Sequence, residues 1–234
     1  MMEQNAIRAA LDFSWNEASI ALADRQNRLL FSNTIMLNGH DASMLPEELK
    51  RAAEQAGCSL DGIAEWSVGT GPGGFTGLRV ASAFVCGLAY GRPGVRVRGV
   101  PPAAGLIRSA FAGEDKMPEK AVALFDGRRS EILAYGMERK NGSWFHDGFT
   151  AVLQKEEELE NLLKKQKGAA LEKDRRALEK FAPGVAGSID YTPSIRAEEL
   201  IFNDPENFTA SPTDLIYLRA AVFVEARIPR TIPL

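Results

Sequence analysis

Cysteine and histidine are scarce in this sequence, with two of each among 234 residues. Cys58 and Cys86 lie far apart, and His40 and His146 do not accompany them at the spacing of a zinc site. Two distant cysteines make no disulfide framework either, which favours a reducing, cytoplasmic setting. We therefore expect no metal centre.

Excess positive charge and long apolar runs are also lacking. The 28 Lys and Arg stand against 31 Asp and Glu, and the net charge of −3 excludes a uniformly basic, nucleic-acid-binding surface. The longest apolar run, residues 80–90, is shorter than the ~20 residues that a membrane-spanning helix needs. Asp12 interrupts the only candidate for a signal sequence. We expect a soluble, cytoplasmic protein without membrane contact.

The sequence does contain alternating strand and helix patterns, which favour an α/β fold with mixed sheets. A first unit contains strands and helices within residues 7–36, 43–56, 63–68, 75–90 and 95–100. A second contains them within 103–111, 121–125, 131–137, 143–149, 154–167, 168–171, 174–181 and 194–202. Asp12 and Asp126 end the first strand of each unit. The patterns predict two related lobes, residues 1–102 and 103–234, with the last helix free to pack back on the first lobe.

The densest motif is the glycine loop GTGPGGFTG, residues 69–77, between a strand and a helix. Glycine permits positive φ and close approach of other groups, and N–H groups at a helix N-terminus attract anions. The loop lacks the lysine of a P-loop. It is either an anion site or a tightly packed turn. Similarly, Asp12 and Asp126 either hold Mg²⁺ near a phosphate or cap their own turns.

The helix predicted after this loop, residues 75–90, lacks a charged face. One stripe is apolar, and the other contains small or polar side chains: Arg79, Ser82, Ala83, Cys86 and Tyr90. A helix without a charged, solvent-exposed face is either buried inside one chain or packed against a second subunit.

Basic residues form local clusters in the second half. They are Arg128, Arg129, Lys164, Lys165, Lys167, Arg175 and Arg176. They are either solvated surface or contacts to an RNA backbone. No Ser-His-Asp order and no nucleophile elbow is present, so we expect no catalytic residues.

Residues 69–91, GTGPGGFTGLRVASAFVCGLAYG, resemble the G-x-GPGSFTGLR-x-G-x-x-x-A-x-GLA signature of the TsaB (YeaZ) family. LDFSWNEASIAL, His40 with MLPEEL, DGRRSEILAYGME and IYLR are similar to further segments of that family. The resemblance extends from Leu11 to Arg219. It implies a two-lobed ASKHA fold, which is actin- and hexokinase-like with ribonuclease H-like lobes.

The resemblance further implies a non-catalytic scaffold or dimerisation subunit in tRNA threonylcarbamoyladenosine (t6A) synthesis. Such a subunit binds and activates the larger paralogue TsaD, in a complex that the ATPase TsaE joins and that acts on tRNA. It self-associates through the same helices when TsaD is missing. The implied interface residues are Leu45, Leu49, Ala52, Phe75, Arg79, Ser82, Ala83, Cys86 and Tyr90. No cofactor of its own is implied, with ATP and Mg²⁺ confined to the complex.

The chain departs from the family pattern at Phe13, Gly74, Gly127 and Leu215. These departures leave only a candidate vestigial nucleotide or anion site, formed by Asp12, Gly71, Gly73, Gly74, Thr76 and Asp126. The alternative function is a stand-alone ATP-dependent phosphotransferase of the ASKHA fold, in which Asp12 and Asp126 hold Mg²⁺. It predicts that the isolated chain binds Mg²⁺-ATP and that Asp12→Asn abolishes this binding.

Overall fold

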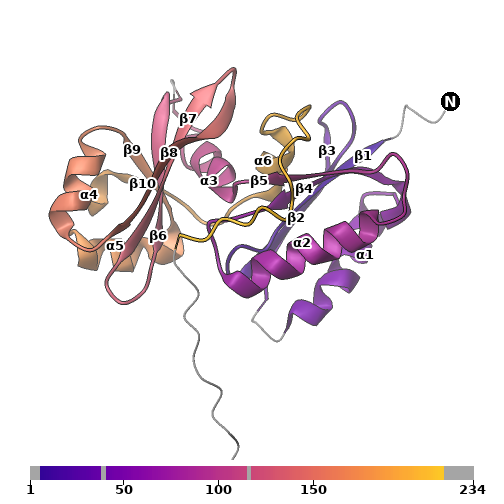
Figure 1. Ribbon diagram of the computed structural model, residues 1–234, viewed down its shortest axis with the longest axis horizontal. Coiled ribbons are helices and arrows are strands. Elements are labelled where there is room, and N and C mark those ends of the chain that lie inside the picture. Colours follow the sequence, from indigo (N-terminus) through magenta and orange to yellow (C-terminus); the bar gives the residue numbers. More distant parts are fainter. Residues whose placement is uncertain (1–5, 38–40, 115–116, 219–234) are drawn as a thin grey trace, which may run out of the picture.

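The computed structural model describes residues 6–37, 41–114 and 117–218 and consists of two lobes, each built on a five-stranded mixed sheet (Figure 1). His40 and Arg219, which carry part of the family resemblance, lie outside the described residues.

The first sheet has the order β3-β2-β1-β4-β5. Its strands are β1 (Ile7–Asp12), β2 (Glu17–Ala23), β3 (Leu29–Met36), β4 (Ile63–Gly69) and β5 (Arg96–Val100). The first three strands are antiparallel, and β4 and β5 run parallel to β1. Helices α1 (Leu45–Gln55) and α2 (Phe75–Ala89) make the crossovers that the parallel strands require.

The second sheet repeats this order as β8-β7-β6-β9-β10. Its strands are β6 (Lys120–Asp126), β7 (Ile132–Lys140), β8 (Ser143–Leu153), β9 (Lys167–Leu171) and β10 (Ile189–Thr192). Again three antiparallel strands are followed by two parallel ones. The prediction of two related lobes is confirmed. Asn141 and Gly142 join β7 to β8 in a tight hairpin turn, with φ of 52° and 83°.

Alternating side chains send each sheet's two faces into separate cores. In β1, Ala9 and Leu11 pack toward α1 and α2, whereas Ala10 packs toward α6 (Ala197–Phe202) on the opposite face. In β6, Ala123 and Phe125 pack toward α3 (Pro102–Ala110), whereas Val122 and Leu124 pack toward α4 (Glu156–Leu163) and α5 (Arg175–Phe181). Each lobe is therefore a sheet covered on both faces (Figure 1).

Several predicted bounds are wrong in detail. The helix predicted from residue 43 begins with a 3-10 turn, η1 (Asp41–Met44), so α1 starts at Leu45 and its N-cap is Met44. Helix α4 is shorter than the predicted 154–167, and β10 was not predicted. The other 3-10 turns are η2 (Leu60–Gly62), η3 (Glu172–Asp174) and η4 (Ala186–Ser188).

The chain returns to the first lobe near its end. Helix α6 lies against the first sheet, where the Ala197 N–H donates to Ser19 Oγ at 3.0 Å. Residues 203–218, which we call the strap, then cross the first lobe from α6 toward the second lobe (Figure 1). A boundary at residue 102 remains a prediction.

Candidate functional site

The glycine loop packs against two backbone segments. A Cβ on Gly73 or Gly77 would lie closer than 3.0 Å to the carbonyl oxygens of Ser14 and Phe13, in the β1–β2 turn. The Gly74 N–H donates to the Ser14 carbonyl. Gly71 has φ of +104°, and a Cβ there would meet the Ile216 carbonyl of the strap. The glycines thus permit close backbone contact, which is one of the two roles that the sequence left open.

Asp12 is enclosed in the first lobe. It is 3% exposed, accepts a hydrogen bond from the Ser14 hydroxyl, and packs over Gly69, where a Cβ would collide with its carboxylate. Burial raises the pKa of Asp12 to about 6, although the hydrogen bond from Ser14 opposes this shift. A buried carboxylate with these partners is placed to fix its own turn.

Asp126 occupies a different environment from Asp12. It lines a pocket between the lobes of about 420 Å³, and its Oδ1 accepts the Arg128 N–H at 2.7 Å. Asp12 is not among the residues that line this pocket. The structure therefore does not bring the two acids together in one accessible pocket.

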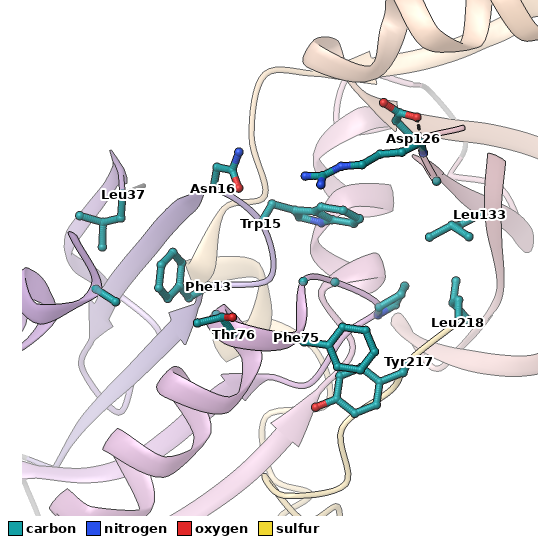
Figure 2. Close-up of a pocket in the computed structure, with 17 residues that line it drawn as sticks. Phe13, Trp15, Asn16, Leu37, Phe75, Thr76, Asp126, Leu133, Tyr217 and Leu218 are labelled. Atoms are coloured by element: carbon teal, nitrogen blue, oxygen red, sulfur yellow. Dashed lines mark hydrogen bonds between the residues drawn. The ribbon is translucent and has the colours of Figure 1, made fainter. Parts of the chain in front are cut away.

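The interlobe pocket is lined mainly by aromatic and apolar side chains. Trp15, which stacks on Phe125 with ring centroids 5.1 Å apart, lies on one side. Phe75 and Tyr217, with centroids 4.3 Å apart, lie on another side (Figure 2). Three residues of the candidate anion site, Gly73, Gly74 and Thr76, line the interlobe pocket. Gly71 does not, because the strap covers it.

Lys173 links the two lobes beside this pocket. Its Nζ lies 4.0 Å from Glu17 Oε1 of the first lobe and 5.5 Å from the Trp15 ring centroid. Its neighbour Asp174 is buried, and burial raises the pKa of that carboxyl to about 6. Within residues 6–37, 41–114 and 117–218, no cluster of three or more His, Cys, Asp and Glu side chains could hold a metal ion.

Helix α2 has one buried face and one exposed face. Leu78, Ala81, Ser82 and Val85 are buried, and Tyr90, just beyond the helix, is 88% exposed. Arg79 and Ala83 are also exposed, and Phe75 and Cys86 are half-buried. Five of the nine predicted interface residues therefore reach the surface: Phe75, Arg79, Ala83, Cys86 and Tyr90.

The other four predicted interface residues require correction. Leu45, Leu49 and Ala52 form the inner stripe of α1 and are at most 1% exposed, because they pack on the first sheet. Ser82 is buried and donates a hydrogen bond to the Pro212 carbonyl of the strap at 2.8 Å. These four side chains are therefore packed or hydrogen-bonded within the chain. The regular stripe of α1 marked a core face rather than an interface.

The strap contributes residues that were not among the predicted site residues. Ile216 N–H donates to the Thr70 carbonyl at 2.7 Å, and Gly99 N–H donates to the Ala210 carbonyl at 2.9 Å. Tyr217 stacks on Phe75, and its hydroxyl accepts from Arg79 Nε at 3.2 Å. The YLR segment was a signal for Tyr217, but its place beside α2 depends on the tertiary fold.

A family model described as TsaD, tRNA N6-adenosine threonylcarbamoyltransferase, matches residues 38–212. The chain belongs to this family. It is 30% identical over 129 residues to the tRNA threonylcarbamoyladenosine biosynthesis protein TsaB of Haemophilus influenzae. That match covers 55% of this chain and 52% of the relative, so the chain spans about half of the length of the curated relative. The TsaB (YeaZ) resemblance inferred from the motifs is confirmed.

Two solved structures share the fold. YeaZ from Pseudomonas aeruginosa superposes with a TM-score of 0.66 at 24% identity, covering 84% of this chain and 89% of that one. A second structure is an uncharacterized protein with similarity to peptidase YEAZ from Pseudomonas aeruginosa. It superposes with a TM-score of 0.72 at 24% identity, and the match covers 92% of this chain and 100% of that one. The predicted two-lobed α/β fold with mixed sheets is confirmed. No helix in the described part of the chain is both long and apolar enough to cross a membrane.

Proposed function

We propose that this chain is a non-catalytic subunit of the machinery that makes tRNA threonylcarbamoyladenosine. In this role it binds and activates a TsaD-like partner in the cytoplasm. The family relationship supports involvement in t6A biosynthesis, because the curated relative is named for that process and the family model describes the transferase. TsaE and tRNA belong to the same proposed complex, and a homodimer is the proposed state when the partner is missing.

The exposed face of α2 carries this proposal. Arg79 is the only charged residue within α2, and small or apolar side chains cover the rest of the helix. Tyr90 at the end of α2 and the Phe75–Tyr217 stack at its start add aromatic area. The cores of protein interfaces are depleted in charge and enriched in aromatic residues and arginine. This face has that composition.

The environment of Asp12 supports a role without catalysis. A phosphotransferase of this fold would need Asp12 and Asp126 to face one metal–phosphate group. Asp12 instead is buried against Gly69 and Ser14, and the interlobe pocket that Asp126 lines does not include it. Ser14 and Phe13 also fill the space beside Gly73 and Gly77 that a phosphate would need. No observation favours the stand-alone phosphotransferase.

The test is association with the partner. Light scattering on a sizing column gives the mass of the chain alone, of TsaD alone, and of the mixture with and without TsaE and nucleotide. We expect a heteromeric peak. Ala83→Arg places a charge on the exposed α2 face and is expected to weaken association at least tenfold, about 1.4 kcal/mol. Ala112→Arg is the matched control, because Ala112 is exposed on the second lobe. A mixture without any complex, or equal losses in both variants, contradicts the proposal.

A further inference from the structure

The turn between β6 and β7 contains three successive residues with left-handed backbone conformation, none of which is glycine. Arg128, Arg129 and Ser130 have φ of 59°, 51° and 60°. The Glu131 N–H donates to the Arg128 carbonyl at 3.1 Å, so Arg129 and Ser130 are the central residues of a hairpin turn with positive φ at both positions. Such turns strongly favour Asn-Gly, because other side chains are strained at positive φ.

The same chain uses the favoured pair one hairpin later. Asn141 and Gly142 join β7 to β8 with positive φ at both positions. The β6–β7 turn therefore has Arg-Ser at the two positions where Asn-Gly, as in the β7–β8 turn, would be less strained. Strained non-glycine residues persist where the surrounding structure holds them in place, and they cluster at ligand-binding sites.

The strained turn forms one wall of a second pocket, of about 330 Å³, and α5 forms another. The turn contributes Arg128 and Arg129, and α5 contributes Lys180. Arg176 lies one helical turn before Lys180 and is exposed, as are all three lining cations. In the described part of the chain, Arg129 and Lys180 form no ion pair or side-chain hydrogen bond.

The two acids in this pocket are already engaged. Asp126 Oδ1 accepts the Arg128 N–H at 2.7 Å, and Glu131 Oε1 accepts from Gln154 Nε2 at 3.3 Å. The two acids keep their negative charges, so the three cations give the lining a net charge of about +1, and the exposed Arg176 lies close by, on a chain whose net charge is −3. Arginine and lysine at the open rim of a pocket match the phosphates of an extended polyanion, and arginine can bind a phosphate with two parallel hydrogen bonds.

We infer that the pocket between the β6–β7 turn and α5 binds the phosphate backbone of an RNA. The inference rests on the proposed function, in which tRNA is the macromolecule that the complex acts on. Arg129 and Lys180 hold adjacent phosphates, and the left-handed turn keeps Arg129 opposite α5. Contacts to phosphates carry no sequence information, so the site positions the tRNA and does not select it.

The experiment measures binding of fluorescently labelled, unmodified tRNA by anisotropy at several salt concentrations, for the chain alone and for its complex with TsaD. The test variant is R129N/S130G/K180A, which removes two cations and installs the favoured turn. The control is K164A/K165A, which removes two cations from the same lobe but none from the pocket. Thermal unfolding of a third variant, R129N/S130G, measures how the turn substitutions alone change stability.

We expect the test variant to bind tRNA about tenfold or more weakly than wild type. We also expect the slope of log affinity against log salt to fall in magnitude by about two, because each of the two missing cations no longer neutralises a phosphate. The control should lose clearly less affinity. R129N/S130G should melt at a higher temperature than wild type, which separates weaker binding from impaired folding.

The inference is overturned if the test variant and the control have the same affinity and salt slope in both the chain and the complex. It is also overturned if inorganic pyrophosphate, but not tRNA, binds in a way that depends on Arg129 and Lys180. Association with TsaD is measured separately on the sizing column. Intact association with unchanged tRNA binding refutes only this site, whereas absent association with site-dependent tRNA binding refutes only the proposed function.

Discussion

Arg98 fixes the strap on the first lobe and gives the sharpest prediction. Its side chain lies on β5 beneath the end of α6 and is 3% exposed. Nη2 donates to the carbonyls of Leu200 and Ile201 at 2.8 and 3.0 Å, and Nε donates to Ser67 Oγ at 2.9 Å. Nη1 donates to two strap carbonyls, at residues 204 and 207. The last carbonyls of a helix lack partners in the helix, and a cation there is favourable.

The magnitude follows from these hydrogen bonds. Arg98→Met leaves the buried Leu200 and Ile201 carbonyls without their hydrogen-bond donor. Removing a hydrogen bond to a charged donor costs roughly 1.5–3 kcal/mol for each carbonyl. The strap carbonyls can regain water. Burial lowers the pKa of Arg98 to about 10, which shows that the charged form is disfavoured by desolvation. Methionine avoids that cost and gains apolar burial of about 1–2 kcal/mol. The two carbonyls together lose about 3–6 kcal/mol, so we expect a net loss of about 1–5 kcal/mol.

Urea unfolding measures this loss, and limited proteolysis should detect faster cleavage within residues 203–218. Arg98→Lys keeps the charge but cannot span the acceptors, so it should fall between wild type and Met. Arg96→Met is the control on the same strand. The Arg96 side chain is 45% exposed, pairs with Glu65 and lies over the ring of Phe208 in the strap, so a smaller loss of about 1 kcal/mol is expected. An Arg98→Met variant whose free energy of unfolding lies within about 0.5 kcal/mol of wild type, with an unchanged cleavage pattern, would refute the role of Arg98 in holding the strap.

Three further predictions concern stability. The pKa of Asp12 is raised from its ordinary value of 3.8 to about 6 in the folded chain. Ionisation of Asp12 therefore destabilises the fold as the pH rises from about 4 to about 6. Asp12→Asn should therefore raise the free energy of unfolding at pH 8 by about 1–3 kcal/mol and change little at pH 4; urea melts with the opposite pH order would contradict this. Gly73→Ala should cost about 1–3 kcal/mol through its collision with Ser14, whereas Gly74→Ala, whose Cβ would stand 3.5 Å from the same carbonyl oxygen, should be nearly neutral by the same measurement. Leu49→Ala should cost about 2–5 kcal/mol but leave TsaD affinity per folded molecule unchanged on the sizing column; a specific loss of affinity would restore Leu49 to the interface.

Local features of this chain were predictable from local sequence. The Asn141–Gly142 turn and the apolar character of α2 depend on residues close in the sequence, and the structure contains both. The similarity of the two lobes was visible because the first strand of each lobe is followed by a turn acid and an antiparallel partner. Strand β10 was missed, because four residues carry too little periodicity to identify a strand.

The sequence by itself determined the two-lobed fold, the family and the existence of a helix without a charged face after the glycine loop. Only the tertiary structure decided which side chains remain accessible. Burial of Leu49 and Ser82 depends on the first sheet and the strap, which are far from them in sequence. Enclosure of Asp12 likewise depends on its packing against Gly69 of the neighbouring strand. Periodicity tells which residues share a face, but long-range packing determines what that face contacts.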